Sequence, residues 1–151
     1  MPYEIRLANK KEALDCIRLS RKSWPHWWAN NEKVAEKHIK RRVKEKKALV
    51  AVLGKKVVAF VLFDETWNQI HLEDLYVEKK YRRNGIASRL INAIEEKYGK
   101  RGFKKIMSDL DTTNKISYKF HLKNGFKKVG FIKDLWGEKD SYVFSKSIRQ
   151  V

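Results

Sequence analysis

A mostly apolar stretch near the middle of the chain carries three side chains that can exchange a proton or attract a cation. His71, Glu73 and Asp74 lie within residues 70–77, which have the composition of a β-strand. Alternation along a strand places His71 and Glu73 on one face and Asp74 on the other. Burying an unpaired carboxylate is costly. Glu73 therefore indicates either a salt bridge to one of the many lysines or a site that attracts or deprotonates an ammonium group.

A basic loop follows this strand and precedes a pattern of apolar residues at helical spacing. Residues 82–87 read RRNGIA. Free backbone N–H groups and the helix dipole at the start of a helix favour an anion. Gly85 and the small Ala87 allow a phosphate to approach the backbone, and Arg82 and Arg83 add positive charge. A single glycine matches neither G-x-G-x-x-G nor G-x-x-x-x-G-K-[ST], so an ordinary basic loop is the alternative interpretation.

A second polar segment begins at Asn114, which can cap the next helix. Ser117, Phe120 and His121 are spaced three and four positions apart, so they share one side of that helix. His121 is a candidate general acid, because an imidazole with its ordinary pKa of about 6.5 can give a proton near neutral pH. Tyr118 is the alternative donor, and a partly exposed helix residue is the alternative interpretation of His121.

The two segments together resemble those of the GNAT superfamily of N-acetyltransferases. The phosphate-loop signature of that family, [Q/R]-x-x-G-x-[G/A] after a strand, is met by Arg82, Gly85 and Ala87. The second family segment, N-x-x-[A/S]-x-x-[L/F]-Y-x-x-x-G-F, is met by residues 114–126 with one exception. His121 stands where the family usually has tyrosine.

The resemblance, which is good over residues 57–131, implies acetyl-CoA as cofactor, CoA as product, and no metal. In the family the loop amides hold the CoA pyrophosphate, and the backbone of the preceding strand binds the pantetheine arm. The backbone N–H of Val77 or Leu75 is expected to stabilise the oxyanion. The cofactor-binding positions that the resemblance implies are Leu75, Tyr76, Val77, Arg82, Arg83, Asn84, Gly85, Ile86, Ala87, Ser88, Asn114, Ser117 and Phe120.

The resemblance also implies that the amine attacks the thioester directly, without an acyl-enzyme. Glu73 is the candidate for the base that takes the proton of the amine, and His71 is the alternative. We expect His121, or Tyr118 in its place, to give a proton to the departing thiolate, with solvent as a further source.

The acceptor amine is less well specified than the cofactor. Glu73 and Asp74 are expected to face it, and the string LEDLYV resembles the corresponding strand of diamine acetyltransferases. Trp27 and Trp28 fall where the family has its acceptor-side helices, and aromatic rings can stack on a cation, with core packing as the alternative. We favour a small-molecule amine. The alternatives are a protein N-terminus or lysine as acceptor, or a nucleic-acid-binding module without catalysis.

Strands and helices must alternate to position these residues, as the apolar patterns indicate. Strands are predicted over residues 3–7, 48–53, 57–63, 70–77, 105–110, 126–132 and 141–148. Helices are predicted after Asn9, from Asn30 or Asn31 to about residue 46, from Gly85, and over residues 114–123, and a loop or short turn is predicted at residues 24–28. The order β-α-α-β-β-β-α-β-α-β-β is an α+β fold. As a GNAT-type fold, it implies a mixed, mainly antiparallel central sheet with helices on both faces, in a single N-acetyltransferase domain over residues 1–151.

The charge is strongly positive, with 35 Lys and Arg against 18 Asp and Glu and a formal net charge of +17. Such a charge favours anionic partners, so nucleic acid or the ribosome joins acetyl-CoA and the amine as an expected partner. A generally charge-rich proteome is the alternative explanation. Cys16 lies in an apolar helical pattern and is predicted to be a small core residue. The sequence has no apolar stretch of signal-peptide or membrane-spanning type. We therefore expect a cytoplasmic protein without a membrane partner, and a homodimer is one option for its assembly.

Overall fold

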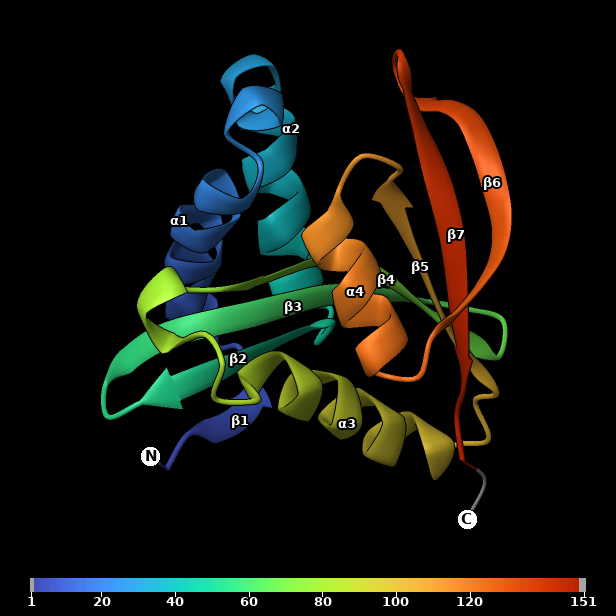
Figure 1. The fold of residues 1–151 in the computed structure, drawn as a ribbon. Helices are drawn as coiled ribbons and strands as arrows, with labels where there is room; N and C mark the ends of the chain where they lie inside the picture. Colours follow the sequence, from blue (N-terminus) through green and yellow to red (C-terminus); the bar gives the residue numbers. More distant parts are fainter. Residues whose placement is uncertain (1, 150–151) are drawn as a thin grey trace. The chain divides into compact units, whose positions relative to one another are not determined.

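The computed structural model describes residues 2–149 and confirms the expected order of elements (Figure 1). The strands are β1 (Glu4–Leu7), β2 (Ala48–Leu53), β3 (Lys56–Thr66), β4 (Gln69–Val77), β5 (Lys105–Asp111), β6 (Lys127–Trp136) and β7 (Lys139–Ser147). The helices are α1 (Ala13–Ser23), α2 (Pro25–Lys44), α3 (Ile86–Gly99) and α4 (Lys115–Lys123), with short 3-10 helices η1 (Lys10–Glu12) and η2 (Lys79–Tyr81). Within residues 2–149, no helix is both long enough and apolar enough to cross a membrane.

The strands form a sheet in the order β1-β2-β3-β4-β5-β7-β6. The pairs β1·β2, β2·β3, β5·β7 and β6·β7 are antiparallel, whereas β4 and β5 are parallel. The fold is therefore α+β with a mixed, mainly antiparallel sheet, as predicted. The contacts within the chain define two compact units: unit 1 comprises Met1–Asp64 and Asp74–Ile94, and unit 2 comprises Glu65–Glu73 and Glu95–Val151. A single domain over residues 1–151 stays a prediction.

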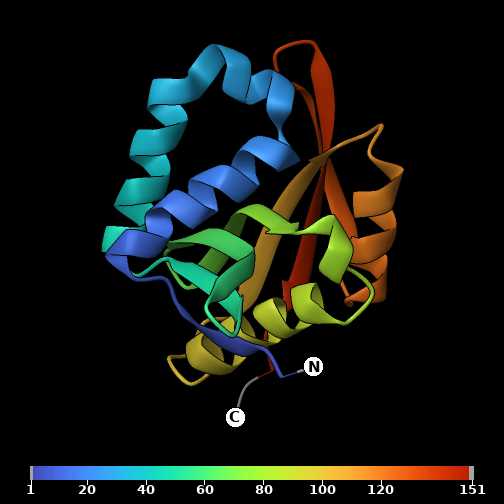
Figure 2. The ribbon, with the colours of Figure 1, turned by 90° about the vertical axis from the view of Figure 1, so that its left-hand side faces the viewer.

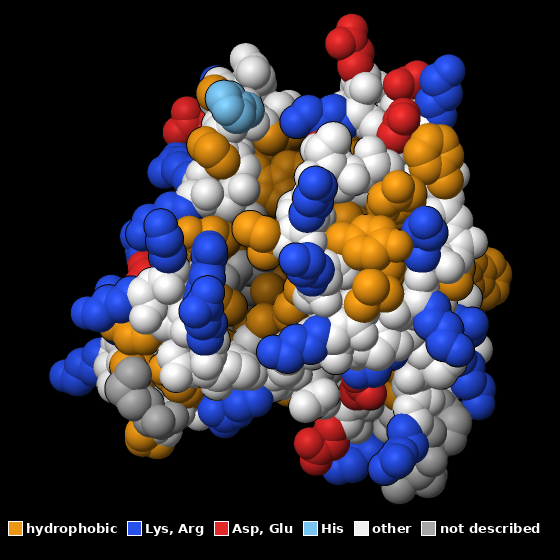
Figure 3. Space-filling model, in the orientation of Figure 1, with side chains coloured by type: hydrophobic (Ala, Val, Ile, Leu, Met, Phe, Trp, Pro, Cys, Tyr) orange, Lys and Arg blue, Asp and Glu red, His pale blue; other side chains and the backbone are white. Residues whose placement is uncertain are grey.

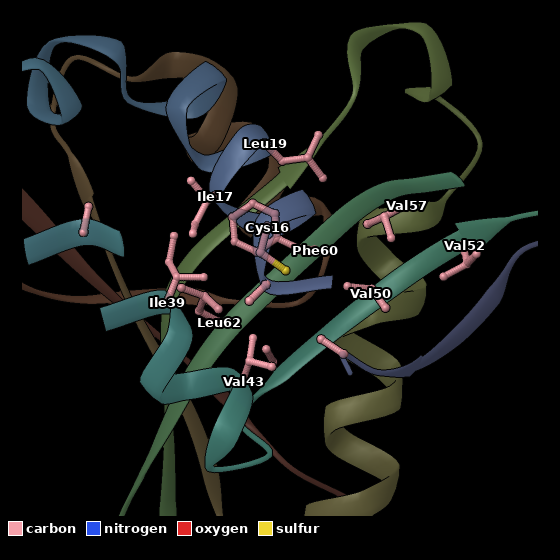
Figure 4. Close-up of a cluster of buried hydrophobic side chains, with 14 of the residues drawn as sticks. Cys16, Ile17, Leu19, Ile39, Val43, Val50, Val52, Val57, Phe60 and Leu62 are labelled. Atoms are coloured by element: carbon pink, nitrogen blue, oxygen red, sulfur yellow. The ribbon is translucent and has the colours of Figure 1, made fainter. Parts of the chain in front are cut away.

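Unit 1 has a hydrophobic core between a helix pair and a strand pair. Figure 4 shows side chains of α1 and α2 pointing toward those of β2 and β3, with α3 passing behind these strands. Cys16, Ile39 and Phe60 are among the buried members, which confirms that Cys16 is a core residue. Burying one such apolar side chain stabilises the fold by roughly 1.5–3 kcal/mol. Helices cover both faces of β2 and β3, which explains why these strands read as continuous apolar runs.

In the tryptophan-rich segment 24–28, residues 25–28 are helical, so the prediction of a loop or turn is wrong for all but Trp24. Trp24 is the N-cap of α2, and Pro25 occupies its first position. Proline suits that position, because its missing N–H would have had no partner at a helix start. Asn31, a predicted helix start, instead lies at a kink inside α2 with φ −137° and ψ 24°, and its Nδ2 donates to the carbonyl oxygen of Trp27. Figure 2 shows the sharp change of direction between α1 and α2.

The predicted helix start at Asn9 is confirmed. Asn9 Oδ1 accepts a hydrogen bond from the backbone N–H of Glu12, and Glu12 Oε1 accepts one from the backbone N–H of Asn9. This is the reciprocal capping box that the spacing predicts. The Glu12 carboxylate also accepts hydrogen bonds from both terminal nitrogens of Arg6, at 2.6 and 2.8 Å, and these bonds lower the pKa of Glu12.

Unit 2 contains β5, β6 and β7, with α4 packed against this layer (Figure 1). Phe144 of β7 is fully buried there. The closing hairpin is longer than predicted, because β6 continues to Trp136 and β7 begins at Lys139, with Gly137 at φ +70° in the turn. Every residue of β6 is exposed. An exposed end strand has no alternation between core and solvent, so no apolar pattern indicated its full length.

Candidate active site

The loop between β4 and α3 has an open backbone with two left-handed residues. Arg83 and Gly85 have φ of +67° and +73°. The left-handed conformation of Arg83 costs roughly 1 kcal/mol, and such strain is concentrated at functional loops. A Cβ on Gly85 would meet no heavy atom within 4 Å. The loop therefore leaves space beside the first turn of α3, where an anion is favoured.

Arg82 links this loop to the end of β4. Its Nε donates to the carbonyl oxygen of Val77 over 2.9 Å, and its guanidinium carbon lies 5.1 Å from the ring centroid of Tyr76. Tyr76 packs against the hydrophobic core of unit 1. Asn84 Nδ2 donates to the carbonyl oxygens of Tyr81 and Arg82 at 3.0 and 3.3 Å. Side chains of the loop therefore hold its carbonyl groups in place.

Glu78, which was not among the predicted site residues, anchors the end of β4. Its buried carboxylate accepts a hydrogen bond from Arg18 Nη1 at 2.6 Å, and it lies 3.2 Å from Lys56 Nζ and 3.5 Å from Lys22 Nζ. Burial raises the pKa of Glu78, but the hydrogen bonds from Arg18 and Lys56 outweigh burial and lower it. The available sequence signal was a lone carboxylate between an apolar strand and a basic loop.

The Asp74 carboxylate is held by a chain of hydrogen bonds that starts on α2. Trp28 Nε1 donates to Ser20 Oγ over 2.9 Å, and Ser20 Oγ donates to Asp74 Oδ2 over 2.7 Å. Ser20 and Trp28 are both buried, and hydrogen bonds shielded from water are electrostatically stronger. Ser20 was not predicted to take part, although a serine on the apolar face of α1 was a visible signal.

The two candidate tryptophans lie in different environments. Trp28 is only 4% exposed, whereas Trp27 is 37% exposed. The two rings are edge-to-face, with centroids 6.4 Å apart, and the Arg21 guanidinium lies 5.0 Å from the Trp28 centroid. Trp28 therefore packs in the core of unit 1, whereas Trp27 has exposed ring surface that a ligand can reach.

In unit 2, β4 and β5 bring an imidazole and a carboxylate together. His71 Nε2 lies 3.0 Å from Asp109 Oδ2, and the His71 side chain is 43% exposed. With Nε2–H donating to the carboxylate, a neutral His71 carries its lone pair on Nδ1, an arrangement that orients a general base. His71 and Glu73 are half-buried, whereas Ile70 and Leu72 are buried, so burial alternates as predicted over residues 70–73. Asp74 is half-buried like Glu73, so burial does not test its predicted place on the other face.

His121 is buried and hydrogen-bonded at both ring nitrogens. Nδ1 lies 2.7 Å from the carbonyl oxygen of Ser117, and Nε2 lies 2.8 Å from Ser108 Oγ. A carbonyl oxygen only accepts, so Nδ1 carries the proton of the neutral ring and Nε2 accepts from the serine hydroxyl. Burial lowers the pKa of His121, partly offset by the Ser117 hydrogen bond and the Asp109 charge. The ring is therefore neutral at pH 7.

The remaining candidates on α4 surround this histidine. Asn114 caps α4 as predicted, and its Oδ1 accepts from the backbone N–H of Ser117 at 3.0 Å. Ser117 and Phe120 are half-buried. Tyr118 packs edge-to-face on Phe144 with ring centroids 5.3 Å apart, and His121 lies 4.8 Å from the same ring. Both candidate acids therefore rest against one buried ring of β7.

The predicted residues thus fall into two groups, one in each unit. Unit 1 holds the open loop, the end of β4 and the Asp74 carboxylate. Unit 2 holds Glu73, the pair of His71 and Asp109, and the buried His121. In unit 1 the loop at Gly85 can bind an anion, and the Asp74 carboxylate can bind a cation. In unit 2 the side chains can exchange protons.

Comparison with known proteins identifies the family. Residues 13–126 match the model of the acetyltransferase (GNAT) family. The PaiA N-acetyltransferase from Thermoplasma acidophilum, solved in complex with coenzyme A, has a TM-score of 0.81 and 21% identity, covering 97% of this chain and 99% of that chain. An aminoglycoside 6'-N-acetyltransferase complexed with coenzyme A has a TM-score of 0.81 and 21% identity, covering 100% and 99% of the two chains. The ribosomal-protein-S18-alanine N-acetyltransferase from Escherichia coli has a TM-score of 0.75 and 13% identity, covering 99% of this chain and 96% of that chain. No curated protein sequence matches the chain.

Structural likeness at these identities shows the fold, and the family model shows the membership. The matched residues 13–126 make up more than half of the chain and include the loop at Gly85 and the helix capped by Asn114. The chain therefore belongs to the acetyltransferase (GNAT) family and is an acetyl-CoA-dependent N-acetyltransferase.

Proposed function

We propose that this enzyme transfers an acetyl group from acetyl-CoA directly to the primary amine of a small molecule. The observation that carries this choice of acceptor is the Asp74 carboxylate, which the Trp28–Ser20 chain holds in one position. The same unit exposes the rings of Trp24 and Trp27 at the corner between α1 and α2. A fixed carboxylate and exposed aromatic rings are two ways of recognising an ammonium group.

The loop at residues 82–88 is the proposed site for the pyrophosphate of acetyl-CoA. The open space at Gly85 and the start of α3 support this assignment, because a phosphate needs both close backbone approach and free N–H groups. Backbone groups of Leu75, Tyr76 and Val77 bind the pantetheine arm, as the family resemblance implies. The Val77 carbonyl oxygen already accepts a hydrogen bond from Arg82. We therefore assign the contact of Val77 with the cofactor to its backbone N–H group. Asn114, Ser117 and Phe120 stay proposed cofactor contacts on the same resemblance.

Glu73 is the proposed base, and the pair of His71 and Asp109 is the second candidate. In the reaction the amine nitrogen bonds to the acetyl carbon and the carbon–sulfur bond breaks. The base takes a proton from nitrogen, and the thiolate gains one to become CoA. The N–H of Val77 or Leu75 stabilises the oxyanion formed between these events. The hydrogen bond between His71 and Asp109 favours the second candidate, because it orients the imidazole.

His121 remains a proposed proton donor to the thiolate only in its imidazolium form. Its lowered pKa makes that form a minority at neutral pH. Tyr118 or solvent is therefore the proposed donor at neutral pH, and His121 contributes at acidic pH.

A panel of acceptors tests the proposed substrate class. Polyamines, aminoglycosides and amino acids are compared with peptides that carry a free N-terminus or a lysine, and released thiol is followed. We expect turnover of small cationic amines, and we expect Asp74→Asn to raise KM for the amine while KM for acetyl-CoA stays unchanged. Turnover of peptides alone would contradict the proposal.

Acetylation of a protein is the second candidate function. The net charge of +17 supports it, because a basic surface favours docking on RNA-rich particles. A ribosomal-protein acetyltransferase also shares this fold. Activity on peptides that is faster than on every small amine of the panel would favour this alternative.

A further inference from the structure

Unit 2 contains a hollow in which aromatic rings and lysines meet. The hollow has a volume of about 310 Å³ and is lined by Thr112, Lys115, Tyr118, Lys119 and Tyr142. The Tyr118 and Tyr142 rings are edge-to-face with centroids 5.6 Å apart, and Lys128 Nζ lies 4.6 Å from the Tyr142 centroid. Figure 3 shows hydrophobic side chains gathered beside Lys and Arg side chains over this part of the surface.

The row of rings continues onto β6. Phe131 lies with its ring centroid 6.4 Å from that of Tyr142, and it is 56% exposed. Lys128 Nζ also lies 5.9 Å from the Tyr118 centroid. Three rings from α4, β7 and β6 therefore form one partly exposed strip, which we call the tyrosine strip (Tyr118, Tyr142 and Phe131).

The lysines at the tyrosine strip have no anionic partner among the residues that the structure describes. Lys115, Lys119 and Lys128 are exposed, and none forms an ion pair with any of residues 2–149. Lys115 and Lys119 stand four positions apart on α4, where like charges repel. Lys115 also lies in the first turn of α4, where the helix dipole disfavours a cation. This arrangement opposes helix stability, and an external anion would relieve it.

We propose that the tyrosine strip and its three lysines bind single-stranded nucleic acid. Bases of any sequence can stack on aromatic rings, and lysines track the phosphate backbone, which is the combination that single-strand-binding proteins use. The net charge of +17 adds long-range attraction for a polyanion. A single strand exposes base faces and phosphates together, whereas a duplex exposes phosphates alone.

Other occupants fit the tyrosine strip less well. An acidic peptide supplies carboxylates but no large planar faces for the rings. A second copy of this chain would bring three more unpaired lysines to the same place, and like charges there would repel. The nucleotide part of CoA has a base and phosphates as well, so the test must separate it from a nucleic acid.

Fluorescence anisotropy of a labelled oligouridylate of about twelve nucleotides tests the proposal. The double variant Lys119→Glu/Lys128→Glu should raise Kd by about tenfold or more, while Lys37→Glu/Lys40→Glu on α2 should raise it by less than about threefold. Lys37 and Lys40 are exposed and form no ion pair with residues 2–149, so the control makes the same change of charge elsewhere. Equal losses in the two double variants would show attraction by net charge alone and would overturn the proposal.

A second pair of variants tests stacking. Tyr142→Leu should weaken binding by about tenfold, and Tyr142→Phe should retain most of it, because the ring and not the hydroxyl carries the stacking. Equally tight binding of duplex RNA or polyglutamate would overturn the proposal, as would displacement of the oligonucleotide by saturating CoA. We expect the lysine variants to transfer acetyl groups at the rate of the unmodified protein, which would show that they are folded.

Discussion

His121 and Cys16 show how burial decides which single residues can react. Burial, helped by the charges of Asp15 and Glu12, raises the pKa of Cys16 to about 12, so this thiol stays protonated and serves the core. Burial lowers the pKa of His121, so this imidazole stays neutral. Sequence motifs located His121 correctly on its helix, but its charge state depends on its burial in the folded protein, on the Ser117 carbonyl group and on the charge of Asp109.

His121 should make the stability of the protein depend on pH in a specific window. Its folded pKa lies below the unfolded value of about 6.5, so the unfolded chain takes up the proton first as the pH falls. The stability from neutral His121 is therefore present above about pH 6.5 and is lost as the pH falls through the folded pKa. Below about pH 6.5, urea unfolding of His121→Gln should show a flatter dependence of stability on pH than that of the unmodified protein. The depressed carboxyl pKa values of Glu12, Glu78 and Asp111 act at lower pH. Identical slopes in the two proteins would contradict a depressed His121 pKa.

The same histidine links pH to turnover. If imidazolium is the donor to the thiolate, turnover should fall as the pH rises through the lowered pKa, and His121→Ala should remove that limb. A profile of kcat that is the same in the two proteins at every pH below about 6.5 would assign the proton to Tyr118 or solvent.

Substitutions at Glu73 and Asp109 test which side chain takes the proton of the amine. Glu73→Gln should lower kcat by about a hundredfold or more while the affinity for CoA stays near its original value, because the amide keeps the shape and removes the base. Asp109→Asn is the informative comparison, since it leaves His71 in place without its carboxylate partner. A loss on Asp109→Asn that exceeds the loss on Glu73→Gln would move the role of base to His71.

At the scale of elements, the corner between α1 and α2 determines how a carboxylate of β4 is held. The helix start at Pro25 places Trp28 one turn into α2, where its indole reaches Ser20. The apolar runs of the sequence predicted the strands, and residue spacing predicted the helix caps, but neither predicted the helix start at Pro25. Bulky aromatic residues beside a proline resemble a loop, and the burial of Trp28, which makes a helix favourable, depends on the tertiary fold.

A pair of tryptophan variants compares the buried Trp28, which holds Ser20, with the exposed Trp27. Trp28→Phe should lower the free energy of unfolding by about 1 kcal/mol through loss of the hydrogen bond to Ser20. It should also raise KM for the amine, because the Asp74 carboxylate loses its fixed position, with KM for acetyl-CoA unchanged. Trp27→Phe, at an exposed ring, is the control and should change stability less. Original values of both stability and the amine KM in Trp28→Phe would show that the indole does not hold Ser20 and Asp74 in place.

At the scale of the whole molecule, the chain shows which features a sequence can predict. The proposed phosphate loop and the helix capped by Asn114 are local motifs, so the sequence alone selected their residues as candidates. Ser20 with Asp74, Arg18 with Glu78, and His71 with Asp109 are pairs separated by 54, 60 and 38 positions. No local pattern indicates such a pair, because it forms only when distant segments pack together. The net charge was equally plain in the sequence, but the gathering of lysines around the tyrosine strip was not.

Two matched glycine variants test whether CoA binds at the Gly85 loop. Gly85 and Gly137 have φ of +73° and +70°, and a Cβ on either would meet no heavy atom within 4 Å. Gly85→Val and Gly137→Val therefore introduce similar backbone strain, but only the first places a side chain where the phosphate would lie. Thermal unfolding is measured with and without millimolar CoA, which at a hundred times Kd stabilises by about 2.7 kcal/mol. We expect CoA to raise Tm of the unmodified protein and of Gly137→Val and to leave Tm of Gly85→Val unchanged. A rise in Tm of Gly85→Val equal to that of Gly137→Val would contradict the assignment of the phosphate site.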